Sequence, residues 1–146
     1  MTAGTEIKLD LDGLHSPASL LRFVRANWWF PICFEWPEFG ELDVRKVEVR
    51  KTVRGYHVVL FVRNKIPSLY LIIVQLSLGS DPKRECVNLR RIVELNLKIW
   101  NVFYRDKMTH GRFTGHENRL DKRTAKLILD QINEWVLWKV RGLEPF

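Results

Sequence analysis

The chain has 146 residues, of which 46% are hydrophobic and 28% are charged, and its net charge is +7. This length and composition predict one folded domain, residues 1–146, and exclude a disordered chain. Two cysteines are too few for a disulfide framework, and the lack of a leader pattern or a long apolar run predicts a cytoplasmic protein with no membrane partner. The positive charge either serves solubility or indicates an anionic partner such as nucleic acid.

The first quarter of the chain predicts a strand, a helix and a second strand. Residues 7–12 alternate between apolar and polar side chains, as a half-buried strand does. Ser16 and Pro17 form the cap and the first position of a helix that fades near Asn27. The aromatic-rich segment that follows predicts a short strand over residues 32–36.

A β-hairpin is predicted over residues 44–63. One face of its first arm is apolar, with Val47, Val49 and Val53, and the other face is largely basic. Gly55 is expected in the turn because glycine accepts a positive φ without steric cost. The second arm, residues 56–62, is rich in β-branched and aromatic side chains and predicts a central strand. The polar side of the first arm consists of Lys46, Glu48, Arg50, Thr52 and Arg54.

Two helices and a strand are expected next. Residues 67–78 are apolar nearly all round, which predicts a buried helix, although a buried strand fits the same run. Asp81 and Pro82 form the start signature of a second helix. Residues 98–105 predict a strand. The second helix is expected to bury Cys86, Leu89 and Val93 and to expose Lys83, Arg84, Arg90 and Arg91.

The last part of the chain predicts a mobile basic loop over residues 105–123 and an amphipathic helix over residues 124–140. The order of elements predicts an α+β fold, with a ferredoxin-like or RRM-like antiparallel sheet, helices mostly on one face and a C-terminal helix. The free face of the sheet would carry Lys8, Asp10 and Asp12.

Asp10 and Asp12 are the first candidate site. A D-x-D pair on a strand points both carboxylates to one face, about 7 Å apart along the backbone. Such a pair suits Mg²⁺ or Mn²⁺ together with phosphate groups. The same pair is also common where a strand simply ends in a turn. The sequence thus predicts a magnesium or manganese site or a solvated strand end, and no other cofactor.

His57 is the candidate catalytic partner of this pair. A histidine beside two carboxylates can bind a phosphate or transfer a proton, and it can equally be packed within the sheet. Tyr56 and His57 point to opposite faces of their strand. The sequence leaves open which of the two shares a face with Asp10 and Asp12.

The segments L-D-L-D-G and T-V-R-G-Y-H-V resemble signatures of the archaeo-eukaryotic primase (primase–polymerase) superfamily. The resemblance implies a palm-like RRM core, a metal bound by Asp10 and Asp12, and His57 near the phosphates of an incoming nucleotide. The family's third carboxylate lies downstream of the histidine, where Asp81 has the pattern of a helix cap and Asp106 ends a predicted strand. A catalytic member and a degenerate, non-catalytic relative both fit.

Basic side chains form three clusters, on the hairpin, on the helix that starts at Asp81 and in the predicted loop. Positive charge spread in this way suits contacts with phosphates, and exposed aromatic rings can stack on bases. The same clusters are compatible with solvated charged surfaces. The candidate nucleic-acid-binding residues are Lys46, Arg50, Arg54, Tyr56, Lys83, Arg84, Arg90, Arg91, Arg105 and Arg112.

These patterns favour a nucleic-acid-binding protein that contacts the phosphate backbone through a basic sheet face and a basic loop. One alternative is a metal-dependent, primase-like nucleotidyl transferase that uses Asp10, Asp12 and His57. Another is a homo-oligomer without nucleic acid, in which Trp135 and Trp138 bury a symmetric interface.

Overall fold

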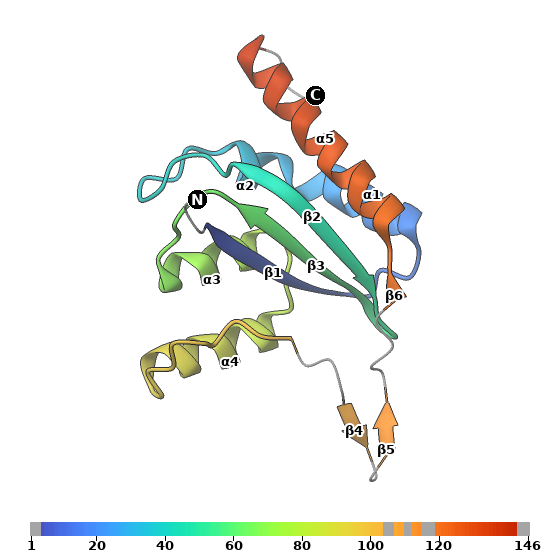
Figure 1. The fold of residues 1–146 in the computed structure, drawn as a ribbon, viewed down its shortest axis with the longest axis vertical. Helices are drawn as coiled ribbons and strands as arrows, with labels where there is room; N and C mark the ends of the chain where they lie inside the picture. The colour runs from blue at the N-terminus through green and yellow to red at the C-terminus, as the bar shows by residue number, and fades with distance from the viewer. Residues whose placement is uncertain (1–3, 104–106, 110–111, 115–118, 143–146) are drawn as a thin grey trace.

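The computed structural model describes residues 4–103, 107–109, 112–114 and 119–142. Its centre is a four-stranded antiparallel sheet with the order β1-β3-β2-β6 (Figure 1). The strands are β1 (Thr5–Asp12), β2 (Val44–Lys51), β3 (Gly55–Val62) and β6 (Arg119–Leu120), and β4 (Lys107–Thr109) pairs separately with β5 (Arg112–Thr114). The helices are α1 (Pro17–Asn27), α2 (Trp29–Cys33), α3 (Ser68–Ser77), α4 (Pro82–Val93) and α5 (Lys122–Val140).

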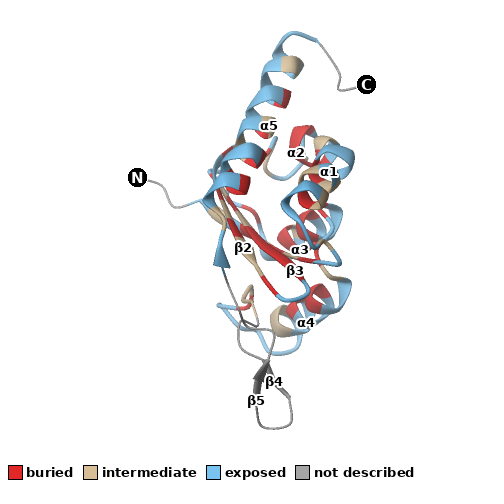
Figure 2. Ribbon diagram, turned by 90° about the vertical axis from the view of Figure 1, so that its right-hand side faces the viewer, coloured by how far each residue is buried: buried red, intermediate tan, exposed pale blue. Residues whose placement is uncertain are grey.

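The sheet has one covered face and one open face. Figure 2 shows α1, α2 and α3 on the same side of β2 and β3, and Figure 1 shows α5 crossing beside β2. Strand β3 lies between β1 and β2, as in the split βαβ unit of ferredoxin-like folds. The predicted α+β class with a ferredoxin-like arrangement is confirmed, and β6 extends the sheet beside β2.

The hydrophobic core fills the covered face, and the predicted alternation of β1 is confirmed, with apolar side chains inward and polar ones outward. Trp135 of α5 is 2% exposed within a single chain. The prediction that Trp135 contributes to a symmetric interface is therefore wrong, because this ring is already buried in the core, whereas Trp138 is only partly buried. None of the helices in the described part of the chain is long and apolar enough to cross a membrane. Core residues include Ile7, Leu9, Leu11, Leu20, Val24, Trp28, Val49, Val58, Leu60, Ile128 and Ile132.

The hairpin of β2 and β3 forms as predicted, but Gly55 is needed for a different reason. Gly55 is not among the residues with positive φ. A Cβ atom at this position would lie 1.9 Å from the backbone oxygen of Leu11. Glycine is required because β1 passes so close to the start of β3.

Two predicted strands do not form over the residues that the structure describes. Residues 32–33 end helix α2, and Trp36 makes a single bridge with Gly40. Pro31 fits this helix because it lies in the first turn, where its missing N–H has no intrahelical partner. Residues 98–103 have irregular backbone, and Asn101 reaches β1 through its side chain, which donates to the backbone oxygen of Glu6 at 3.3 Å.

The other predicted elements have mixed outcomes. The apolar run over residues 67–78 is a helix, α3, and the final amphipathic helix is α5. Within the predicted loop over residues 105–123, the described residues form β4, β5 and β6 before α5 begins at Lys122. The remaining residues of that loop lie outside the described part of the chain.

Side chains close the outer edge of β1. Gln75 Oε1 accepts a hydrogen bond from the backbone N–H of Lys8 at 2.9 Å, and Ser80 Oγ accepts one from the backbone N–H of Asp10 at 3.1 Å. The guanidinium of Arg84 donates to the backbone oxygen of Lys8 at 2.9 Å. An open strand edge exposes unpaired backbone groups that recruit other chains. These hydrogen bonds complete the edge without a further strand.

Glu85 holds these edge-closing side chains in place. Its carboxylate accepts hydrogen bonds from Gln75 at 2.7 Å, Ser80 at 2.8 Å, Arg84 at 2.6 Å and Asn88 at 3.2 Å. Helix α4 thus turns a polar face to the sheet, because it packs on a strand edge that is rich in backbone polar groups. The prediction of a buried apolar stripe on this helix is wrong, since the exposed residues include Cys86, Leu89 and Val93.

We expect Glu85→Ala to be strongly destabilising, because it removes the acceptor of four hydrogen bonds and leaves Arg84 buried without its carboxylate. Removing one partner of a buried ion pair costs about 3–5 kcal/mol. Urea denaturation should show a loss of this size in the free energy of unfolding. Glu94→Ala is the control, because Glu94 pairs with Arg90 on the exposed surface just after the same helix, where such pairs contribute about 0–1 kcal/mol. Equal losses in the two variants would contradict the role of Glu85.

Candidate metal centre

Asp10, Asp12 and His57 share the open face of the sheet. Asp10 lies directly opposite His57 in the pairing of β1 with β3, and opposed residues point to the same face. The Nε2 atom of His57 lies 3.6 Å from Oδ1 of Asp10. Tyr56 points into the core and is 1% exposed. His57, and not Tyr56, therefore shares the face of Asp10 and Asp12. The prediction that Tyr56 contacts nucleic acid is wrong because its ring is buried.

The loop before α4 adds a third carboxylate, Asp81. Its backbone N–H donates to the backbone oxygen of Asp10 at 2.8 Å, which ties the start of α4 to β1. One carboxylate oxygen from each of Asp10, Asp12 and Asp81 lies within 4.8 Å of the other two. Asp81 also caps α4, since its Oδ1 accepts from the N–H of Lys83 at 3.1 Å. The predicted cap is confirmed, and the same residue completes a cluster that the cap pattern did not reveal.

The carboxylate cluster carries an electrostatic penalty that a cation would relieve. Burial and, after it, the neighbouring carboxylates of Asp12 and Asp81 raise the pKa of Asp10, Arg84 lowers it, and the net result is a pKa of about 6. Carboxylates that share a site cannot all ionise without repulsion. Oxygens on opposite sides of a Mg²⁺ ion are about 4.2 Å apart, so small side-chain rotations would bring the three within range. The ligand set therefore fits a hard divalent cation.

Aromatic and cationic groups hold His57 in place. Its ring stacks on Phe103, with centroids 4.1 Å apart and planes 6° from parallel. The guanidinium of Arg84 lies 4.8 Å from the centroid of the same Phe103 ring and donates to Asn101 at 2.8 Å. His57 is buried, so the imidazole is fixed beside Asp10. Sequence analysis missed Phe103, because it placed this aromatic residue in a strand.

The basic residues of the hairpin lie at one side of the open face. Arg50 of β2 is opposite His57, so Asp10, His57 and Arg50 form a row across three strands. Lys46 and Glu48 point to the same face as Arg50, because alternate residues of a strand share a face. Arg54 is exposed at the turn. Negative charge thus lies on the β1 side of the open face and positive charge on the β2 side.

The predicted nucleic-acid-binding residues on α4 differ in their exposure. Lys83 and Arg90 are exposed, and Arg91 is half-buried and hydrogen-bonded to neighbouring groups. The prediction is wrong for Arg84, which is buried against Glu85 and serves the edge of β1. Two further predicted contacts lie beyond the described side chains, namely Arg105 and Arg112.

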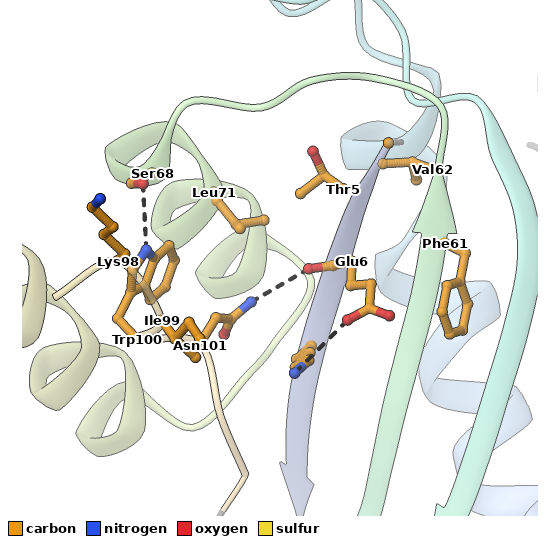
Figure 3. A pocket seen from close by; sticks show the side chains of 12 residues that line it. Thr5, Glu6, Phe61, Val62, Ser68, Leu71, Lys98, Ile99, Trp100 and Asn101 are labelled. Carbon is orange, nitrogen blue, oxygen red and sulfur yellow. Dashed lines mark hydrogen bonds and ion pairs between the residues drawn. The ribbon is translucent and has the colours of Figure 1, made fainter. Parts of the chain in front are cut away.

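A cavity of about 610 Å³ lies beside β1. Figure 3 shows the indole of Trp100 donating to Ser68 and the amide of Asn101 donating to the backbone of Glu6, which fixes one wall of the cavity against β1. Glu6 and Lys8 line the cavity and belong to the same face of β1 as the carboxylates, because alternate residues of a strand share a face. The carboxylates of Asp10, Asp12 and Asp81 are not part of its lining.

No protein-family model, curated protein or solved structure matches the chain. The three carboxylates, the fixed imidazole and the basic side chains are the features of the chain that bear on its function.

We expect Mn²⁺ to stabilise the folded chain at about pH 7.5 and to lose this effect at about pH 5. The pKa of Asp10 is about 6, so at the lower pH a proton competes with the cation for the same oxygens. A metal concentration a hundredfold above Kd should add about 2.7 kcal/mol to the free energy of unfolding. The measurement is the rise in Tm with Mn²⁺ at each pH.

Without metal the pH dependence has the opposite sign. The pKa of Asp10 rises from 3.8 to about 6 on folding, so between about pH 4 and pH 6 the folded state binds a proton that the unfolded state has released. Stability should fall as pH rises through this window. Asp10→Asn should flatten this slope and remove the stabilisation by Mn²⁺, and an equal stabilisation at both pH values would contradict the site.

Proposed function

We propose that this protein binds Mg²⁺ or Mn²⁺ at Asp10, Asp12 and Asp81 and catalyses nucleotidyl transfer to a nucleic-acid strand. One observation carries the proposal. Carboxylates from two segments far apart in the sequence place their oxygens within 4.8 Å of one another, on the open face of a sheet. Proteins commonly bind these cations through a few carboxylates and leave the remaining positions to phosphate oxygens.

The side chains around the cluster have distinct roles in this proposal. The cation would neutralise charge on the transferred phosphates and orient them. The three carboxylates position it, and burial of Asp10 strengthens their electrostatic hold. His57, fixed by Phe103, lies beside Asp10 and can donate a hydrogen bond to a phosphate oxygen. Arg50 follows His57 in the cross-strand row and supplies positive charge further along the phosphate chain.

The order of these residues supports the resemblance to the primase–polymerase superfamily. That pattern has a D-x-D pair, then a histidine, then a third carboxylate. Asp81 follows His57 in the chain and lies beside Asp10 in space. The proposed substrates are accordingly a nucleoside triphosphate and a nucleic-acid strand.

A second function, nucleic-acid binding without catalysis, is favoured by the basic side of the open face. Lys46 and Arg50 share the face that carries His57, and Arg54 is exposed at the end of the same hairpin. These side chains would contact phosphates through charge alone, so this function needs no metal. The metal requirement separates the two proposals.

We expect Asp10→Asn and Asp81→Asn each to lower metal-dependent nucleotide incorporation by at least about a hundredfold, because several kcal/mol of transition-state stabilisation depends on the cation. The measurement is transfer of a labelled nucleotide to primed and unprimed single strands with Mg²⁺ or Mn²⁺. Asp130→Asn on the exposed side of α5 makes the same chemical change away from the cluster and should leave the rate unchanged.

Two results would overturn the assignment of the carboxylates. One is full activity in the Asp10 and Asp81 variants with their folded state intact by circular dichroism. The other is a wild-type chain that binds no Mn²⁺ in isothermal titration calorimetry. A wild-type chain that binds nucleic acid and metal but transfers no nucleotide would leave the second function in place of the first.

A further inference from the structure

A basic groove of about 390 Å³ lies between β2 and α5. Its floor is apolar, with buried Val49 and Ala125 and partly buried Leu129. Five cationic side chains and one acidic side chain line it. The cations are Arg45, Lys46, Arg50, Lys122 and Lys126, and the acid is Glu48.

The positive charge of the groove is only partly neutralised. Glu48 is shared between Lys46 at 4.0 Å and Arg50 at 3.3 Å. Lys122 and Lys126 are exposed, and no described acidic side chain forms an ion pair with either of them. Their spacing of four residues puts both on the same side of α5. The groove therefore has unneutralised charge on its helical wall.

The strand wall of the groove is an open sheet edge. Strand β6 pairs with β2 only at Arg50 and Lys51, and Asp121 donates its N–H to the backbone oxygen of Val49. Within the described part of the chain, residues 44–48 have no strand partner on this side. Cationic side chains on a sheet edge can serve simply to prevent pairing with other chains. An experiment has to separate this protective role from ligand binding.

The groove lies at the far end of the cross-strand row that starts at the candidate metal centre. Arg50 lines the groove and is also the last member of the row Asp10, His57 and Arg50. Neighbouring strands are about 4.8 Å apart, so the groove begins roughly 10 Å across the sheet from the carboxylates. A phosphate chain bound at one end through a cation at the carboxylates would reach the groove at Arg50.

We propose that the β2–α5 groove binds the phosphodiester backbone of a nucleic-acid strand without the aid of metal. This inference rests on the proposed function, because it assigns the path of the nucleic-acid substrate away from the carboxylates. Lysine and arginine side chains contact phosphates by charge, and release of counterions makes such binding weaker as salt rises. The apolar floor suits the sugars between the phosphates. DNA and RNA share this backbone chemistry.

The test is fluorescence anisotropy with labelled single-stranded DNA and RNA of equal length, in EDTA, from low to moderate salt. The groove variant is Lys122→Glu with Lys126→Glu. The control variant is Arg22→Glu with Lys65→Glu, which changes the net charge by the same amount at exposed positions outside the groove lining. A second groove variant, Lys122→Gln with Lys126→Gln, removes the charges without reversing them, and circular dichroism checks the fold of each.

We expect the Glu variant of the groove to bind at least about tenfold more weakly at low salt. The slope of log affinity against log salt should become shallower by about 1.4, since each lost phosphate contact on a single strand accounts for about 0.7. The Gln variant should show the same change of slope, and the control variant should bind within about twofold of wild type. A preference of the wild-type chain for DNA or for RNA would identify which nucleic acid the groove binds.

Three results would overturn the proposal. They are unchanged binding in both groove variants, equal weakening in the groove and control variants, and no binding of either strand by the wild-type chain at low salt. The first would leave the cations with the role of guarding the edge of β2. EDTA removes divalent cations from the carboxylates, so this assay tests the groove alone, whereas failure of the metal centre would appear as loss of Mn²⁺ binding and of nucleotide transfer.

Discussion

The need to satisfy the backbone at the outer edge of β1 governs much of this structure. No strand covers that edge in the described part of the chain, so side chains of α3, α4 and their connecting loop supply the hydrogen bonds to β1. Glu85 holds those side chains by accepting hydrogen bonds from Gln75, Ser80 and Arg84. The same contacts bring the backbone of Asp81 to that of Asp10. The contacts that close the strand edge therefore also bring the three carboxylates together. A change that loosens α4 from β1 would disturb both stability and the candidate metal centre.

The open face separates charge of opposite sign across three strands. Carboxylates gather at β1, where burial keeps the pKa of Asp10 near 6, and cations gather at β2 and continue to α5. A divalent cation would neutralise the negative charge at β1, and phosphates would neutralise the positive charge at β2. His57 lies between them and is held by Phe103. This arrangement links the proposed chemistry with the proposed path of the strand.

Local patterns predicted the parts of the fold that depend on periodicity. The alternation in β1 and β2 identified Val47 and Val49 among the side chains that enter the core, and the run over residues 67–78 formed a helix. The prediction was wrong for Val53, which lies beyond the end of β2 in the turn and is exposed, whereas Thr52 is buried. Patterns failed where an element packs against something other than an apolar surface. Helix α4 was expected to bury Leu89, yet it buries Asn88 because its neighbour is a polar strand edge. The segment over residues 98–103 looks like a strand, but it contacts β1 through the side chain of Asn101.

The sequence by itself determined that Asp10 and Asp12 share one face, because alternation along a strand is a local property of the backbone. It also determined the hairpin that carries His57 and the basic side of β2. Only the tertiary structure decided that His57 shares the face of the aspartates while Tyr56 is buried, because the pairing register and the covered face depend on contacts between distant segments. It likewise placed Asp81 beside Asp10, since a cap pattern describes a helix start and not its neighbours in space.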